Sequence, residues 1–80
     1  MRESQIQAKI IKQYEADGWY VIKLIQTNKN GIPDLICLKN NQVLFIEVKN
    51  EKGVVSELQK YRHQELLKYG FETKIISNAS

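Results

Sequence analysis

Cysteine, proline and histidine each occur once in this sequence of 80 residues, as Cys37, Pro33 and His63. A single cysteine excludes an internal disulfide and any metal site built from several thiolates. Because Cys37 lies inside an apolar run, we predict that it is a buried core thiol. The protein is therefore expected in a reducing cytoplasm, that of the host cell if the source is viral.

Long hydrophobic runs are also missing. No segment approaches the ~18 consecutive apolar residues of a membrane-spanning helix, and the N-terminal residues MRESQ lack the apolar core of a secretory signal. The charged fraction is 26%, as in ordinary soluble proteins, and we predict one domain over residues 1–80 with no membrane partner. A domain of this size buries only about 60–65% of its unfolded surface, so a partner subunit would add stability.

The basic residues outnumber the acidic ones, which gives a net charge of +3. That charge suits a polyanionic partner such as nucleic acid, although many other proteins share it. Lys29 is well placed to contact a phosphate because it precedes a glycine turn, whereas any lysine taken alone is more often a solvated surface residue. The other candidates for such a surface are Lys23, Lys39, Lys52 and Lys60.

Two amphipathic helices are predicted, one near each end of the chain. Apolar residues recur every four positions over residues 3–17, as on one face of a helix, and Gly18 follows as a C-terminal cap. The second helix opens at Ser56, which forms the pattern of a capping box with Gln59, and stops at Gly70. Its predicted apolar face consists of Val55, Leu58, Leu66 and Tyr69.

Four strands are expected from runs rich in β-branched and aromatic residues. Asn40 and Asn41 separate the second and third runs, and Asn tolerates the positive φ of a two-residue hairpin turn. The order is helix, three strands, helix, strand, which predicts an α/β fold with two helices packed on a small mixed sheet. The expected strands cover residues 19–25, 34–38, 43–49 and 71–76, with a frayed tail at 77–80. Trp19 and Tyr20 could lie in the core or in a dimer contact, and we expect the core.

The predicted hairpin turn fixes the pairing of its strands. Lys39 then pairs with Gln42 and, four pairs further on, Leu35 pairs with Ile46. The next pair sets Asp34 directly opposite Glu47, with Cβ atoms about 5 Å apart on one face of the sheet. Two carboxylates so placed repel each other, and they weaken the sheet unless a positive charge lies between them.

Two sources of positive charge fit this position. Lys49 lies two residues beyond Glu47 and therefore on the same face. The other source is a divalent cation such as Mg²⁺, which takes one or two carboxylates and completes its shell with water and substrate phosphate. The carbonyl of Val48 could add a ligand. Ordinary surface ion pairing is the alternative, but charges at the end of an apolar strand are costly without a role.

Four short segments carry a family resemblance: ESQIQ at 3–7, GIPDL at 31–35, IEVK at 46–49 and SELQ at 56–59. In this order they resemble the PD-(D/E)XK nuclease superfamily and, more closely, a stand-alone VRR-NUC domain, the small nuclease module of phage and repair enzymes. The resemblance covers nearly the whole chain. It implies a restriction-endonuclease-like αβββαβ core.

The chemistry that the arrangement supports is hydrolysis of a phosphodiester with Mg²⁺ or Mn²⁺ at Asp34 and Glu47. Lys49 would orient or deprotonate the attacking water, or stabilise the transition state. The resemblance further implies 5′-phosphate and 3′-hydroxyl products, and a homodimer that cuts branched DNA such as four-way junctions. No small-molecule cofactor is expected. The alternatives are an inactive nucleic-acid-binding module with this fold and, with less support, a restriction-type duplex cutter.

Four further residues have two readings each. Glu3 falls on the apolar stripe of the first helix, where it is expected to be a further metal ligand and catalytic residue, although acids are also favoured near helix N-termini. By the resemblance Gln59 approaches the active site, whereas locally it completes the capping box. Arg62 could meet a carboxylate or phosphate, but we favour a side chain that reaches water. His63 could be a catalytic base, but we expect a surface residue on an exposed flank of the helix.

Overall fold

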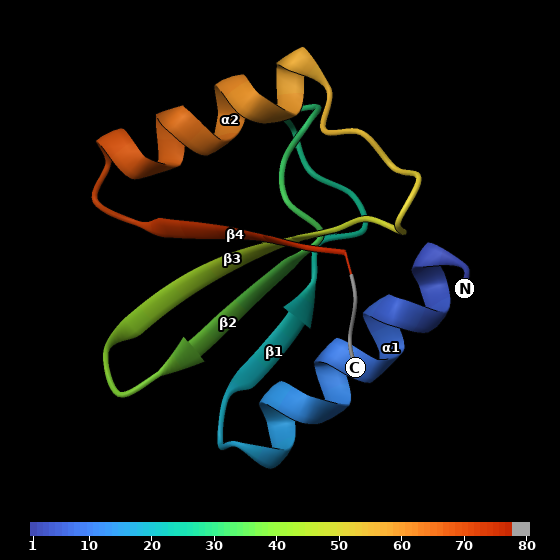
Figure 1. The fold of residues 1–80 in the computed structure, drawn as a ribbon. Helices are drawn as coiled ribbons and strands as arrows, with labels where there is room; N and C mark the ends of the chain where they lie inside the picture. The colour runs from blue at the N-terminus through green and yellow to red at the C-terminus, as the bar shows by residue number, and fades with distance from the viewer. Residues whose placement is uncertain (78–80) are drawn as a thin grey trace.

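The structure is a computed structural model that describes residues 1–77. A four-stranded sheet lies between two helices (Figure 1), which confirms the predicted fold class. The predicted tail at 77–80 lies outside the described residues except for Ser77, which is exposed. In chain order the elements are α1 (Glu3–Ala16), β1 (Tyr20–Lys23), β2 (Leu35–Lys39), β3 (Gln42–Val48), α2 (Glu57–Lys68) and β4 (Glu72–Ile76).

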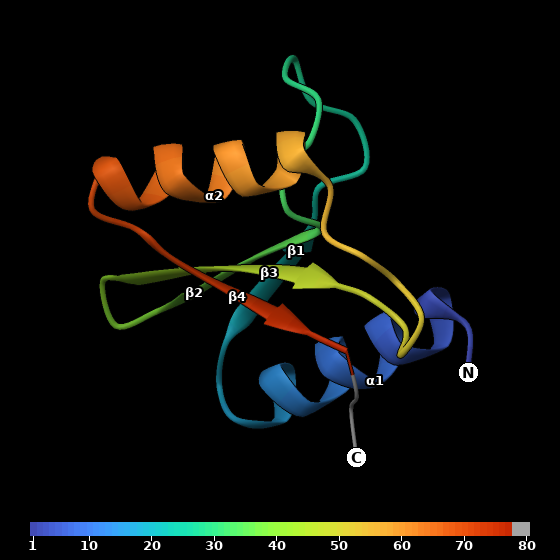
Figure 2. The same cartoon turned by 45° about the horizontal axis from the view of Figure 1, so that its top comes forward.

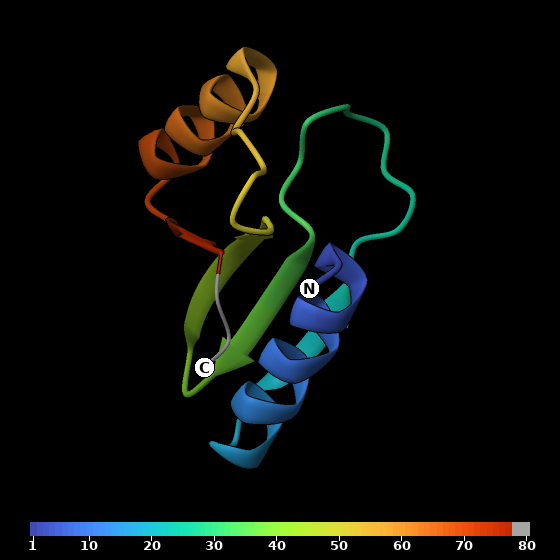
Figure 3. The ribbon, with the colours of Figure 1, turned by 45° about the vertical axis from the view of Figure 1, so that its right-hand side comes forward.

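The strands stand in the order β1-β2-β3-β4. The first three pair antiparallel as a meander, and β4 returns through α2 to pair parallel with β3. Figures 2 and 3 show the consequence: α1 runs along one side of the sheet and α2 along the other. No helix among residues 1–77 has the length and apolar character that crossing a membrane requires.

The hairpin between β2 and β3 has the predicted turn and register. Asn40 and Asn41 adopt φ angles of 49° and 64°, as the two central residues of a type I′ turn require. The pairing runs from Lys39 with Gln42 to Leu35 with Ile46. Because this register is confirmed, residues beyond it on both strands are also aligned, and this alignment positions the site described below.

The hydrophobic core lies between α1 and the sheet. Ile6 and Ile10 of α1 meet aliphatic side chains of β2 and β3, and Cys37 is fully buried among them as predicted. Trp19 is half-buried, packs against this cluster and stacks at a tilt on Tyr14. Most of the stabilising apolar burial therefore lies on one side of the sheet. The buried set is Ile6, Ile10, Leu35, Cys37, Leu44, Ile46 and Val48.

Two expectations about packing are wrong. Tyr20 is 68% exposed, because β1 is an edge strand and α2 does not extend over it. The predicted apolar face of α2 is wrong in part: Val55 and Leu66 are half-buried, whereas Leu58 is 43% and Tyr69 is 75% exposed. Among the residues of α2 only His63 is buried, so this helix turns a polar face to the sheet.

The segment between β1 and β2 is held against α2. Arg62 donates from Nε to the carbonyl oxygen of Asn30 at 2.8 Å and from Nη1 to Glu65 at 3.1 Å. Gly31 lies so close to the helix that a Cβ at this position would stand 2.7 Å from Cγ of Leu58. This contact, together with a φ of +79°, explains why glycine stands here. The segment that leads into Asp34 is therefore anchored at its centre.

Candidate active site

Glu47 is the most buried ionisable residue of the site, with 1% of its surface exposed. It lies near the end of β3, where strand alternation turns it away from the aliphatic core and toward α2. Its Oε2 accepts a hydrogen bond from Nε2 of Gln59 at 3.1 Å and lies 3.7 Å from Nζ of Lys49. Two neighbouring groups therefore hold one oxygen of this carboxylate.

Asp34 is held immediately before β2 begins. Its Oδ2 accepts a hydrogen bond from the backbone N–H of Val48 at 2.7 Å, and its carbonyl accepts from Leu24 at 2.8 Å. The hairpin register, continued by one pair, sets Asp34 opposite Glu47. The backbone of Leu24, directly after β1, thus fixes the main chain of Asp34, and the backbone of Val48 in β3 fixes the direction of its carboxylate.

The two carboxyl groups interact as the register predicts. The pKa of Glu47 is raised to about 7, chiefly because the carboxyl is buried and also because the Asp34 carboxyl interacts with it through charge and hydrogen bonding. Lys49 opposes the shift but does not cancel it. The ionised form of this carboxyl is therefore destabilised, and a bound cation would stabilise it.

The donor set fits a hard divalent cation. Oε1 of Glu47 is buried and has no hydrogen-bond partner, although a buried carboxylate oxygen normally has one. Continued by two pairs beyond Leu35 and Ile46, the hairpin register sets Val48 opposite Pro33, which has no N–H to donate to the Val48 carbonyl. Carboxylate oxygens from Asp34 and Glu47 together with this carbonyl are the ligand types that Mg²⁺ and Mn²⁺ accept.

Gln59 has both of the roles considered for it: it caps α2 and it contacts the carboxylate of the site. Its Oε1 accepts from the N–H of Ser56 at 2.9 Å, while its own N–H donates to Oγ of Ser56 at 3.1 Å, which completes the capping box of α2. Its Nε2 remains available and donates to Glu47. One side chain therefore begins the helix and also holds the central carboxylate.

The sequence and the fold of the chain are matched by known proteins. The family model of the VRR-NUC domain matches residues 1–78. The chain belongs to the VRR-NUC domain family. A VRR-NUC domain of known structure superposes with a TM-score of 0.85 at 28% identity, covering 96% of this chain and 85% of the other.

A second solved structure, a VRR-NUC domain protein, superposes with a TM-score of 0.76 at 19% identity, covering 99% of this chain and 80% of the other. At that identity the likeness shows the fold alone. A comparison with curated proteins returned no match. The family assignment makes this chain a nuclease domain of the PD-(D/E)XK type.

Within this VRR-NUC domain, Asp34, Glu47, Lys49 and Gln59 are brought together, whereas Glu3 is not. The expectation that Glu3 points to the interior is wrong, because its side chain is exposed. Ile6 and Ile10 face the sheet instead, and the first turn of α1 projects past the buried part of the helix. No group of three or more His, Cys, Asp or Glu residues within 1–77 is arranged to hold a metal, so Glu3 does not complete such a group.

The positions predicted for two residues of α2 are wrong. His63 is buried, and its Nε2 lies 3.9 Å from Oε1 of Glu47, where burial lowers the pKa of the imidazole. Arg62 does not reach into water but binds Asn30 and Glu65. The signal that could have placed His63 is its spacing of four residues from Gln59, which puts both on one face of a helix.

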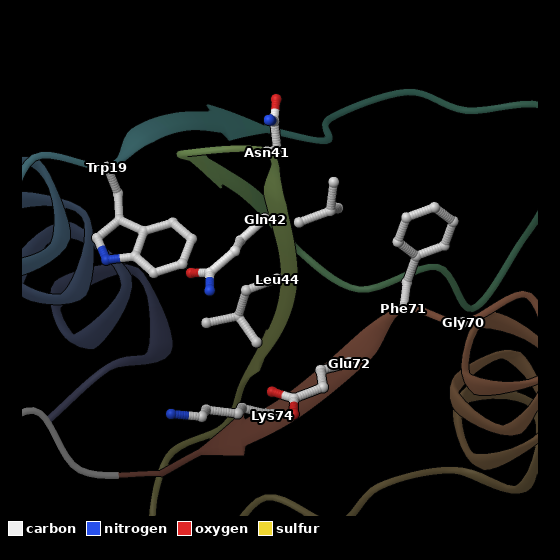
Figure 4. A pocket seen from close by; sticks show the side chains of 9 residues that line it. Trp19, Asn41, Gln42, Leu44, Gly70, Phe71, Glu72 and Lys74 are labelled. Atoms are coloured by element: carbon white, nitrogen blue, oxygen red, sulfur yellow. The ribbon is translucent and has the colours of Figure 1, made fainter.

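One cavity of the structure lies away from the carboxylates. About 420 Å³ of space lies near the hairpin, between Trp19, Phe71 and the beginning of β3 (Figure 4).

Of the candidate phosphate-binding lysines, Lys39 already has a partner, because its Nζ donates to the Asp17 carbonyl and lies 3.7 Å from the Asp17 carboxylate. Lys29, at the exposed tip of the segment before Asp34, remains available to a phosphate backbone.

Proposed function

We propose that this chain is a metal-dependent endonuclease that hydrolyses DNA phosphodiester bonds. The observation that carries the proposal is the juxtaposition of Asp34 and Glu47 on one face, with Lys49 beside them. Asp34, Glu47 and the Val48 carbonyl would hold Mg²⁺ or Mn²⁺. When bound, that ion supplies charge neutralisation at the phosphate and a more acidic water.

The chain's own residues then carry out the remaining tasks. Nζ of Lys49 is held near Oε2 of Glu47, where it orients the attacking water and stabilises charge that develops on the phosphate. Gln59 keeps the Glu47 carboxylate in place. Because Asp34 is bound to the N–H of Val48, little rearrangement is needed when the substrate arrives. Such preorganisation is what makes electrostatic stabilisation effective.

The test is cleavage of end-labelled DNA by the full chain, with Mg²⁺, with Mn²⁺ and with EDTA. We expect metal-dependent cutting by the wild type, and loss of about a thousandfold or more in rate for Asp34→Asn, because several kcal/mol of charge stabilisation disappear. Gln64→Ala, on an exposed part of α2, is the control. Absence of cleavage of every duplex, flap and junction in both metals would overturn the proposal.

That outcome would favour the alternative, an inactive nucleic-acid-binding module. A binding module should retain DNA affinity in Asp34→Ala and should bind no metal tightly. Calorimetric titration of Mn²⁺ into the wild type separates the two functions, because only the nuclease requires a resident ion. The same titration with Asp34→Asn identifies the carboxylate as a ligand.

We further propose that the enzyme acts as a homodimer on branched DNA. The support is the exposed apolar surface on the α2 side, where Tyr20, Ile22 and Phe71 are 68%, 39% and 39% exposed and a second copy could bury them. A two-fold dimer would match the symmetry of a four-way junction. Sedimentation at micromolar concentration should give a dimer, and a labelled junction should be cut in preference to linear duplex. A monomer, or equal cutting of both, would refute this part.

A further inference from the structure

We propose that His63 is a positioning residue of the nuclease, the second hydrogen-bond donor that α2 directs at the Glu47 carboxylate. Gln59 serves Oε2, and His63 faces Oε1. The inference rests on the proposed function, because His63 contributes to the reaction only if Glu47 binds the metal ion.

The first support is that two buried atoms without partners face each other. Among the side chains of residues 1–77, Oε1 of Glu47 and Nε2 of His63 are the buried nitrogen and oxygen atoms that have no hydrogen-bond partner. They lie 3.9 Å apart, which is beyond hydrogen-bond distance. Each unmet group costs about 1–3 kcal/mol, so an approach of about 1 Å that joins them is favourable.

The second support is chemical complementarity. An ionised carboxylate can only accept hydrogen bonds, whereas a neutral imidazole donates from one of its two nitrogens. Donation from Nε2 satisfies both atoms at once, and donation from Nδ1 would leave two acceptors facing each other. The geometry therefore selects the tautomer that carries its proton on Nε2.

The third support is the rigidity of the donor platform. His63 follows Gln59 by one helical turn, and Gln59 is fixed by the capping box. Each carboxylate oxygen has two lone pairs, so donors from both residues still leave lone pairs for a cation. Hydrogen bonds in empty active sites are often long and shorten when the site is loaded. We expect the His63 bond to shorten in this way.

The consequence is measurable in metal affinity. Groups that orient a metal ligand typically contribute about 10–100-fold to affinity or activity. His63→Met replaces the imidazole with an apolar side chain of similar size and removes the donor, whereas His63→Gln places an amide N–H near the position of Nε2. We expect His63→Met to weaken Mn²⁺ binding at least about tenfold and His63→Gln to remain within about threefold of wild type. Gln64→Ala, exposed on the same helix, is the matched control.

The experiment has two arms on the full chain. Calorimetry measures Mn²⁺ affinity of the wild type and the three variants, with thermal unfolding as the check on folding. Long-range ¹H–¹⁵N NMR of the metal-free wild type, at about pH 8 where imidazole is neutral, reads the tautomer directly, because His63 is the sole histidine in the sequence. We expect the proton on Nε2.

The outcomes separate this inference from the proposed function. A proton on Nδ1, unchanged Mn²⁺ affinity in His63→Met, or equal weakening in His63→Met and His63→Gln would overturn the role of His63, even if the wild type cuts DNA. If the wild type neither binds Mn²⁺ nor cuts, the nuclease proposal fails. The tautomer of the wild type then still decides whether His63 donates to Glu47. The same measurement decides it if one of the His63 variants does not fold.

Discussion

The two faces of β3 are built for different purposes. Leu44, Ile46 and Val48 turn toward α1 and are buried among aliphatic neighbours. Glu47 lies between the last two and is equally buried, yet its neighbours on the α2 side are polar or charged. One face of a single strand therefore supplies stability, while the other bears the cost of placing a carboxylate out of water. Substitutions at adjacent positions should separate the two.

The largest effect is expected from Glu47→Gln, which should reduce the rate of DNA cleavage by about a thousandfold or more, because a proposed metal ligand loses its charge. The same variant should unfold at an equal or higher urea concentration at neutral pH, because the buried carboxylate is replaced by a neutral amide. Cleavage kinetics and urea denaturation measure the two effects. If Glu47→Gln lost activity only because it unfolded, the two faces of β3 would not have separate roles in stability and function.

Ile46→Ala should have the opposite pattern. Ile46 is fully buried in the α1 core, so its truncation should cost about 2–5 kcal/mol. That is a large share of the stability of a domain this small, which is expected to be about 4–12 kcal/mol. Urea denaturation should show the loss, whereas Val54→Ala at an exposed site should change stability by less than about 0.5 kcal/mol. Folded Ile46→Ala should retain metal affinity.

The polar face should also make stability depend on pH. The folded-state pKa of Glu47 is raised from 4.5 to about 7, so between these values the unfolded chain releases a proton that the folded chain keeps. Stability of the metal-free protein should therefore fall as pH rises through this window, by up to about 3 kcal/mol, and remain constant above it.

The measurement is urea denaturation in EDTA at a series of pH values. His63, whose pKa is lowered by burial, contributes in the opposite direction below its ordinary value, since the unfolded chain then binds the extra proton. The difference between wild type and Glu47→Gln isolates the carboxyl. A difference that does not change with pH would contradict the assignment.

A smaller effect is expected where the segment before Asp34 touches α2. Gly31 and Gly70 both have positive φ, but a Cβ at Gly31 would collide with Leu58, whereas the space around Gly70 is open. Both alanine variants should lose about 1 kcal/mol or more through backbone strain, and Gly31→Ala should lose about 1–3 kcal/mol beyond that. Adding Leu58→Ala should recover part of the excess. Equal losses of stability in the two alanine variants would show that the contact between Gly31 and α2 does not contribute to stability.

The hairpin and its carboxylate pair could be predicted because they depend on local chemistry. Two asparagines fix a two-residue turn, the turn fixes the register, and the register sets Asp34 opposite Glu47. The αβββαβ order followed from periodicity and capping residues. These inferences needed no knowledge of how the helices lie on the sheet.

The errors arose where a helix meets the sheet. Apolarity was the guide to the inward face of α2, but that face carries Gln59 and His63 because it covers a carboxylate. Helical periodicity likewise gives the angle of Glu3 but not how far along α1 the sheet extends. Tertiary packing decides both, and a polar site reverses the usual rule that the hydrophobic stripe faces inward.

The dual bonding of Gln59 links the start of α2 to the reactivity of Glu47. If the first helical turn frays, the same event that opens the capping box also releases the carboxylate. Loss of enzymatic competence on warming should then precede global melting and follow amide hydrogen exchange in that turn. The temperature range over which the enzyme works would be set by the fraying of a single helical turn, and a stronger cap would extend it.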